Sequence, residues 1–242
     1  MEMAEDIGRR WQSALLAVAQ AHGISDTSTS LEAELESVTM RAVRERGMRS
    51  SFLVLTAPTG VGKTTVGHAL EGAGIRRLPR INTRLPRPGE VEGRDYYFVT
   101  QEEYNRRREA GELLCPTSST DNFAAIPRSE LLEEVARRRF FYIDAGAGTA
   151  RTIKGEPALA QTSFLLCFLL PPSFRAMIER AEARSATEQV RGGSRGTLTP
   201  EWLLRRLEQA VSHLAESVYH ADVYAVNDTV ARATREILSL VP

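Results

Sequence analysis

The sequence predicts an α/β fold in which a central parallel sheet is covered by helices on both faces. Four short segments, residues 52–55, 140–143, 164–169 and 223–226, are almost wholly apolar, which is typical of strands buried on both sides. Segments with helical spacing of apolar residues lie between or after these strands, at 63–71, 128–138, 173–184, 200–219 and 229–240. Alternation of the two patterns indicates parallel strands joined by crossover helices.

Composition is that of a globular protein and argues against several classes of function. The chain has 242 residues, and its 31 basic side chains (29 Arg and two Lys) are balanced by 31 acidic ones. No overall field therefore draws it to nucleic acid or to an anionic membrane. The longest apolar run, 164–170, is too short to span a bilayer. Two cysteines, Cys115 and Cys167, cannot form a disulfide framework, and with no signal-peptide pattern at the N-terminus we expect a cytoplasmic protein.

Residues 1–49 are predicted to form an N-terminal helical extension. A first apolar stripe is followed by a polar linker at 23–30 and by a second stripe, and Thr29 with Glu32 has the spacing of a capping box. The stripes consist of Ile7, Trp11, Leu15 and Val18, then Leu31, Leu35, Val38, Ala42 and Val43. A stripe of this kind packs on its own domain or forms the surface of a homodimer or of a contact with another partner. Both alternatives remain open at this point.

A glycine-rich loop between the first strand and the next helix has the composition of a phosphate-binding loop. It consists of Ala57, Pro58, Thr59, Gly60, Val61, Gly62, Lys63, Thr64 and Thr65. Glycines let successive backbone N–H groups turn inward around phosphates, and the helix N-terminus adds partial positive charge. We expect Lys63 to reach the β- and γ-phosphates of ATP and the Thr64 hydroxyl to ligate Mg²⁺. The alternative is an ordinary glycine-rich turn, but strand, spacing and helix together favour the three-layer fold of P-loop NTPases.

A carboxylate, Asp144, follows the apolar strand at 140–143. The carboxyl ends of parallel strands meet at one edge of the sheet, so Asp144 is expected beside the phosphate loop. There it would position Mg²⁺ or a water on the metal. The alternative is a strand-end residue that caps the following turn.

The segment 81–99, INTRLPRPGEVEGRDYYFV, strongly resembles the guanylate kinase family, and the resemblance extends over about residues 51–242. It implies a core at 50–80 and 127–242, an inserted acceptor-binding lobe at 81–126 and a lid at about 185–199. It also implies that Arg84, Arg87 and Tyr96 hold the phosphate of the acceptor. Two guanidinium groups and a phenol suit one dianion, because they can donate several charge-assisted hydrogen bonds to it.

The positions that read guanine in that family are substituted. In an ungapped register they fall on Arg80, Cys115, Ala124, Ala125, Ile126 and Tyr142. Cysteine, alanine and isoleucine supply neither the carboxylate nor the hydroxyls that complement guanine, so base specificity is predicted to be altered.

On the donor side the resemblance places Arg184 and Arg206 at the transferring phosphates, and Asn227 beside the adenine of ATP. Arg180, Arg191 and Arg195 are further lid candidates. The predicted function is ATP-dependent phosphoryl transfer onto the phosphate of a nucleoside monophosphate, with Mg²⁺ and without nucleic-acid or membrane partners. The alternatives are a kinase of another phosphorylated metabolite, such as a sugar phosphate, and a non-catalytic guanylate kinase-like binding module.

Overall fold

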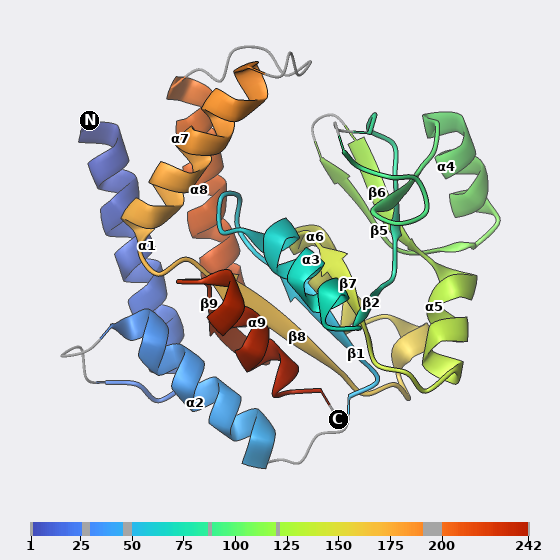
Figure 1. The fold of residues 1–242 in the computed structure, drawn as a ribbon, viewed down its shortest axis with the longest axis horizontal. Helices are drawn as coiled ribbons and strands as arrows, with labels where there is room; N and C mark the ends of the chain where they lie inside the picture. Colours follow the sequence, from blue (N-terminus) through green and yellow to red (C-terminus); the bar gives the residue numbers. More distant parts are fainter. Residues whose placement is uncertain are drawn as a thin grey trace.

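The structure is a computed structural model that describes residues 2–25, 30–45, 50–86, 89–119, 122–190 and 200–241 (Figure 1). Its helices are α1 (Glu2–Ala21), α2 (Leu31–Glu45), α3 (Lys63–Gly72), α4 (Gln101–Glu109), α5 (Arg128–Ala136), α6 (Ala147–Ile153), α7 (Phe174–Val190), α8 (Pro200–Ser217) and α9 (Val230–Leu238), with a short 3₁₀ helix at Pro157–Leu159. Its strands are β1 (Phe52–Thr56), β2 (Arg76–Arg77), β3 (Arg80–Asn82), β4 (Tyr96–Phe98), β5 (Leu113–Ser119), β6 (Asn122–Pro127), β7 (Phe141–Ala145), β8 (Phe164–Leu170) and β9 (Val223–Val226).

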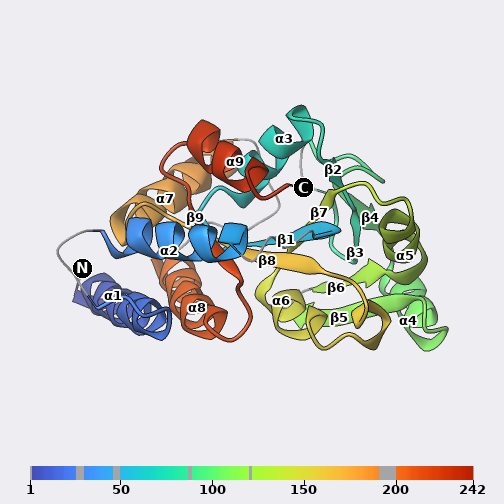
Figure 2. The same cartoon turned by 90° about the horizontal axis from the view of Figure 1, so that it is seen from below.

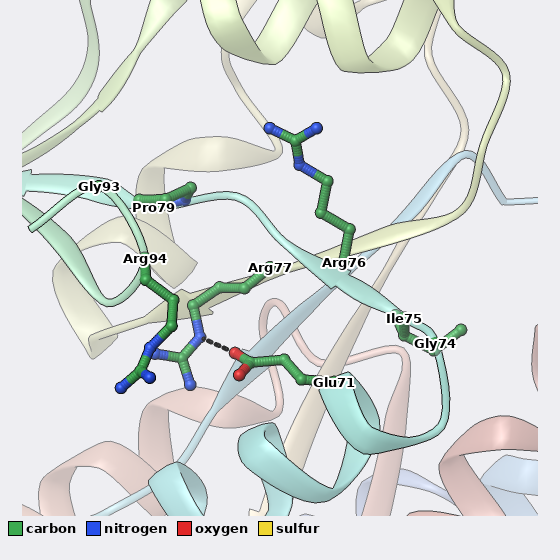
Figure 3. A pocket seen from close by; sticks show the side chains of 8 residues that line it. All are labelled: Glu71, Gly74, Ile75, Arg76, Arg77, Pro79, Gly93 and Arg94. Atoms are coloured by element: carbon green, nitrogen blue, oxygen red, sulfur yellow. Dashed lines mark ion pairs between the residues drawn. The ribbon is translucent and has the colours of Figure 1, made fainter. Parts of the chain in front are cut away.

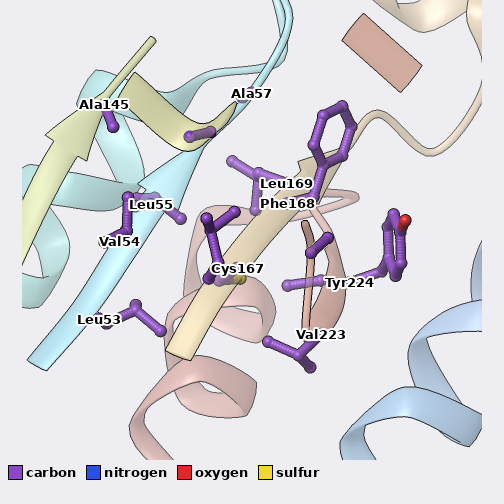
Figure 4. Close-up of a cluster of buried hydrophobic side chains, with 14 of the residues drawn as sticks. Leu53, Val54, Leu55, Ala57, Ala145, Cys167, Phe168, Leu169, Val223 and Tyr224 are labelled. Carbon is purple, nitrogen blue, oxygen red and sulfur yellow. The ribbon is translucent and has the colours of Figure 1, made fainter. Parts of the chain in front are cut away.

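The central sheet has five strands in the order β2-β7-β1-β8-β9, and every neighbouring pair is parallel. Helices α3 and α9 lie on one side of it and α6 and α8 on the other (Figure 2). All five residues of β1 are buried, because β1 has strands on both edges and helices on both faces. Figure 4 shows the resulting core, in which side chains of β1, β8 and β9 meet. The predicted α/β fold with a central parallel sheet is confirmed.

A second sheet, β4-β3-β6-β5, forms a separate lobe together with α4. It mixes parallel and antiparallel pairs and has its own small apolar cluster around Ile81 and Tyr104. Its strands run from Arg80 to Pro127, one residue beyond the predicted lobe at each end.

Two features of the chain differ from the sequence-based expectation. Helix α6 was not foreseen, because Ala147–Ile153 is short and rich in Gly, Ala and Thr. Helix α7 continues past Arg184 to Val190, through the first part of the predicted lid. Residues 185–190 contain no helix breaker, whereas Gly192 and Gly193 follow. The rest of the predicted lid, 191–199, including Arg191 and Arg195, lies outside the described residues.

Both N-terminal helices pack on their own chain. Figure 1 shows α1 alongside α7 and α8. Ile7, Trp11, Leu15 and Val18 are all at most 1% exposed, and the Trp11 ring lies 5.8 Å from the ring of Phe174 at the start of α7. The apolar stripe of α1 is therefore satisfied within the chain. Thr29, the predicted cap of the second helix, lies outside the described residues.

Helix α2 covers the free edge of the sheet at β9. The Oγ1 of Thr39 accepts a hydrogen bond from the N–H of Tyr224 at 3.1 Å, and Oε1 of Glu36 accepts one from the N–H of Val226 at 2.7 Å. Tyr224 and Val226 are two residues apart on an edge strand, and without these acceptors their N–H groups would have no partner strand to bond to. Glu36 also forms an ion pair with Arg232 of α9. The side chains of α2 thus accept the hydrogen bonds from β9 that the backbone of a neighbouring strand would otherwise accept.

We expect Glu36→Ala to lower the free energy of unfolding by about 2–4 kcal/mol, because it leaves the buried N–H of Val226 without its acceptor and removes the nearer of two carboxylates that pair with Arg232. Urea unfolding followed by circular dichroism measures this. Glu45→Ala, at the exposed end of the same helix, is the matched control and should change stability by less than about 0.5 kcal/mol. Equal effects of the two variants would contradict the edge-capping role.

None of the helices in the described ranges combines the length and the apolar character needed to cross a bilayer.

Candidate active site

The predicted phosphate loop lies between β1 and α3, in a conformation that requires glycine. Gly60 and Gly62 have φ angles of 86° and 96°, where any side chain is strained. A Cβ atom on Gly62 would also lie 2.6 Å from Nδ2 of Asn227. The backbone therefore curves around the start of α3, as a loop that binds phosphates through N–H groups must.

Two polar side chains hold this loop from behind. Nδ2 of Asn227 donates to the carbonyl oxygen of Val61 at 2.7 Å, and Nη1 of Arg180 donates to the same oxygen at 3.3 Å and to the carbonyl of Asn227 at 2.9 Å. Asn227 is only 3% exposed. The sequence placed Asn227 beside the donor base and Arg180 in the lid, yet both side chains contact the loop. Only the long-range packing of α7 and β9 against the loop reveals this role.

Asp144 and Lys63 form an ion pair at the carboxyl edge of the sheet. They meet because β7 is the parallel neighbour of β1, with Asp144 opposite Leu55. The side chain of Asp144 is 9% exposed and that of Lys63 20%. The lysine that is predicted to hold phosphates thus contacts a carboxylate.

The oxygen groups at this position suit magnesium. Thr64 is exposed on the first turn of α3, and Asp144 provides a carboxylate close to Lys63. Mg²⁺ prefers hard oxygen ligands and commonly combines one or two carboxylates with phosphate oxygens and water. Among the described residues no group of three or more His, Cys, Asp or Glu could hold a metal by itself. The residues present therefore fit a metal that is bound together with a nucleotide.

Arg84 of the lobe makes a two-pronged ion pair with Glu90. Its two terminal nitrogens lie 2.6 Å from the two carboxylate oxygens. Its guanidinium also lies over the ring of Tyr96, 4.9 Å from the ring centre, and over that of Phe98 at 5.3 Å. The structure thus brings Arg84 and Tyr96 together as expected. Arg87, the third predicted phosphate ligand, lies outside the described residues.

Of the substituted base-reading positions, Arg80 and Cys115 lie together. Arg80 is buried on β3, opposite Tyr96 of β4, and it donates to Oγ1 of Thr149 on α6 at 3.2 Å. Cys115 is buried at an irregularity of β5 with a φ of 47°, and burial raises the pKa of its thiol. The positive charge of Arg80 acts in the opposite direction and is a smaller effect. This end of the lobe therefore contains a cation and a protonated thiol.

The remaining substituted positions lie on β6 and β7. Ala124 and Ile126 lie on β6, where Ile126 is fully buried and the carbonyl of Ala124 accepts a hydrogen bond from Thr117 at 3.1 Å. Tyr142 is fully buried; its hydroxyl donates to Glu71 at 2.8 Å and accepts from Nε of Arg77 at 2.6 Å. Tyr142 therefore contacts α3 and β2.

Helix α8 carries Arg206, one of the predicted donor-side residues. Arg206 donates to Gln209 at 3.2 Å and lies over the ring of Trp202 at 5.3 Å. His213, two turns later on the same face, was not singled out by sequence. Burial lowers the pKa of His213; the carboxylate of Glu216 opposes this shift, and the charges of Arg151, Arg206 and Lys63 add to it. For Arg184 on α7, the side chain lies outside the described part of the structure.

A surface pocket of 340 Å³ lies elsewhere, at the edge strand β2 (Figure 3). It is lined by Glu71, Gly74, Ile75, Arg76, Arg77, Pro79, Gly93 and Arg94. No phosphate-loop residue is among them. The ion pair between Arg77 and Glu71, 2.7 Å long, crosses it.

Comparisons with known proteins identify the family. The family model described as guanylate kinase matches residues 49–241. Guanylate kinases of Symbiobacterium thermophilum and Nocardia farcinica are 35% and 34% identical to this chain, and the matches cover 78% and 81% of it and 83% and 95% of theirs. The crystal structure of guanylate kinase from Anaplasma phagocytophilum shares the fold, with a TM-score of 0.58 at 23% identity over 79% of this chain and 84% of the other. The family model begins after α2. The predicted resemblance, the fold and the membership of a kinase family are confirmed: the chain belongs to the guanylate kinase family.

Proposed function

We propose that this chain is an ATP-dependent phosphotransferase that transfers the γ-phosphoryl group of ATP to the phosphate of a nucleoside monophosphate, with a base choice other than that of a guanine-specific enzyme. The observation that carries the proposal is the ion pair of Lys63 with Asp144 beside a loop whose positive φ angles at Gly60 and Gly62 require glycine. A protein that no longer bound triphosphate would have no need to keep this arrangement. A cytoplasmic location, where ATP is available, is part of the same proposal.

On the donor side, the loop amides and Lys63 bind the phosphates of ATP. Lys63 exchanges Asp144 for the β- and γ-phosphates, which frees the carboxylate to organise the metal together with Thr64. Bound Mg²⁺ neutralises charge that develops on the phosphate oxygens. Arg206, and Arg184 by family resemblance, add positive charge from α8 and α7. Asn227 and Arg180 keep the loop in shape from behind.

On the acceptor side, Arg84, Arg87 and Tyr96 hold the phosphate that receives the γ-phosphoryl group. Arg84 exchanges the two oxygens of Glu90 for two phosphate oxygens, which keep the same two-pronged geometry. The phosphate is itself the nucleophile, so positioning replaces a general base.

A second candidate, a kinase of another phosphorylated metabolite, is favoured by the buried cation at Arg80. Arg80 and Cys115 supply no carboxylate for the donor edge of guanine, and Ala124 and Ile126 supply no hydroxyl. The non-catalytic binding module is the weaker alternative, because the triphosphate loop is intact.

An ATP-consumption screen tests the proposal. Purified protein with Mg²⁺ is supplied with GMP, dGMP, the other nucleoside monophosphates and a set of sugar phosphates, and ADP formation is coupled to a spectrophotometric readout. We expect turnover with at least one phosphorylated acceptor, and GMP should not be the preferred one. Lys63→Met is the blank. If no acceptor raises ADP formation above that blank, phosphotransfer is refuted, and preference for GMP by more than about tenfold would refute altered base choice.

A further inference from the structure

Arg80 is a buried cation that the protein leaves without a carboxylate. It is 7% exposed, Nη1 is bonded to Thr149, and Nε has no partner. Its other neighbours are the phenol of Tyr96, which forms a hydrogen bond with it, the thiol of Cys115, and the like charge of Arg84. In the described ranges no ion pair joins Arg80 to Asp or Glu. Arginine stays protonated in proteins, so this charge cannot be relieved by losing a proton.

Arg77, on the preceding strand β2, is another buried arginine of the same chain and serves as a comparison. It is 6% exposed, and its guanidinium is 2.7 Å from Glu71 and 2.9 Å from Asp95. Burial alone would lower the pKa of Arg77, but Tyr142 and the two carboxylates raise it above the ordinary value; for Arg80, burial dominates and the pKa is lowered. An uncompensated buried charge costs several kcal/mol. The contrast indicates that the counter-charge of Arg80 comes with a ligand.

The position of Arg80 indicates which ligand would supply this counter-charge. Arg80 is paired with Tyr96 across β3 and β4, and the guanidinium of Arg84 lies over the ring of Tyr96. The acceptor phosphate and Arg80 therefore meet the same tyrosine. The hydroxyl of Thr149 and the thiol of Cys115 next to Arg80 can each donate a hydrogen bond. A positively charged site lined by donors suits carboxylate or phosphate oxygens, which only accept hydrogen bonds.

We infer that Arg80 and Thr149 form a subsite for a second anionic group of the acceptor, a carboxylate or a second phosphoryl group, distinct from the phosphate held by Arg84. This inference rests on the proposed function for the identity of the acceptor site. It makes Arg80 a specificity-determining residue, since an acceptor that lacks the second anion leaves the guanidinium unpaired.

Equilibrium binding without ATP tests the inference separately from turnover. Isothermal titration calorimetry compares glycerol 3-phosphate with 3-phosphoglycerate, which adds a carboxylate, and fructose 6-phosphate with fructose 1,6-bisphosphate, which adds a phosphoryl group. In at least one pair the doubly anionic member should bind at least tenfold more tightly to the wild type. Arg80→Met should reduce that ratio to within about twofold. Arg139→Met, which removes an exposed arginine, should leave it unchanged.

Thermal unfolding completes the test. Without ligand, Arg80→Met should raise the Tm by about 2–4 °C or leave it unchanged, because the variant removes a buried charge that has no partner. Three results would overturn the inference: no preference for the second anion in the wild type, equal loss of affinity for both members of each pair, or a Tm of Arg80→Met well below that of the wild type. Equal loss would mean that Arg80 holds the phosphate common to all acceptors. If these binding and unfolding tests failed while the ATP screen showed turnover, the proposed function would stand and only the role of Arg80 would be refuted.

Discussion

Replacing Lys63 by methionine is expected to lower kcat for phosphoryl transfer about 10²–10³-fold. The lysine lies at the first position of α3 and is already held at the carboxyl edge of the sheet by Asp144. When it moves to the phosphates, its charge acts in a site where a preorganised group contributes about 3–4 kcal/mol to the transition state. Methionine keeps the length and apolar stem of the side chain and removes only the charge. Steady-state kinetics with the acceptor found by the ATP screen measures the effect.

The chain offers a matched control for this variant, since it has only one other lysine. Lys154 pairs with Asp222 at 2.6 Å, on the segment that follows α6, outside the phosphate loop. Lys154→Met should keep kcat within about twofold of the wild type. If Lys63→Met retained more than a tenth of wild-type kcat, Lys63 would not be the residue that stabilises the transferring phosphoryl group.

The position of Lys63 beside Asp144 was predictable from sequence because it follows from local rules. A glycine-rich loop between an apolar strand and a helix fixes Lys63 at the start of that helix. A carboxylate at the end of a second buried strand falls on the same edge when the strands are parallel, and β7 is indeed the neighbour of β1. The sequence could not give the ion pair itself, which depends on these two strands being adjacent.

The supports behind the loop were beyond sequence reasoning. Arg180 and Asn227 are 47 residues apart, and both reach the carbonyl of Val61, which is more than 100 residues from each. No spacing rule connects such positions; they meet only after α7 and β9 have packed. The caps that α2 places on β9 have the same origin, because Glu36 and Thr39 read as polar positions of an amphipathic helix until the edge strand is placed beside them.

The acceptor end was predicted only in part. A register carried over from the family assigned Arg80, Cys115 and Tyr142 to one pocket, and in the structure the hydroxyl of Tyr142 bonds to Arg77 and Glu71. Residues two apart on a strand share a face, so Tyr142 points to the same side as Asp144, toward α3. There Gly67 leaves room for the phenol, because a Cβ atom on Gly67 would lie 2.7 Å from the hydroxyl. A tyrosine at this position therefore serves the packing of α3 and β2.

The network around that tyrosine gives the second large expected effect. Arg77→Met should lower the free energy of unfolding by about 3–5 kcal/mol, or roughly 10 °C in Tm, because Glu71 and Asp95 lose their buried counter-charge. The ion pair between Arg77 and Asp95 joins β2 of the core to the segment before β4 of the lobe, so the variant also weakens the attachment of the lobe. Arg94→Met removes a second partner of Asp95, but Arg94 is exposed at 53%, and its loss should cost at most about 1 kcal/mol.

The pH dependence of the stability lost in Arg77→Met shows whether the charge of Arg77 or its packing is responsible. Burial would raise the pKa of Asp95, but the N–H of Val91 and the charges of Arg94 and Arg77 hold it below its ordinary value. A carboxyl with a lowered pKa contributes stability that is complete above about pH 4, its range in the unfolded chain, and is lost as the pH falls further. In Arg77→Met part of that contribution is missing, so the difference from the wild type should be full at pH 7 and smaller at pH 3. Urea unfolding at both pH values measures it. A deficit that stayed constant between the two pH values would mean that the charge of Arg77 is not what stabilises the protein, and would contradict the ion-pair role.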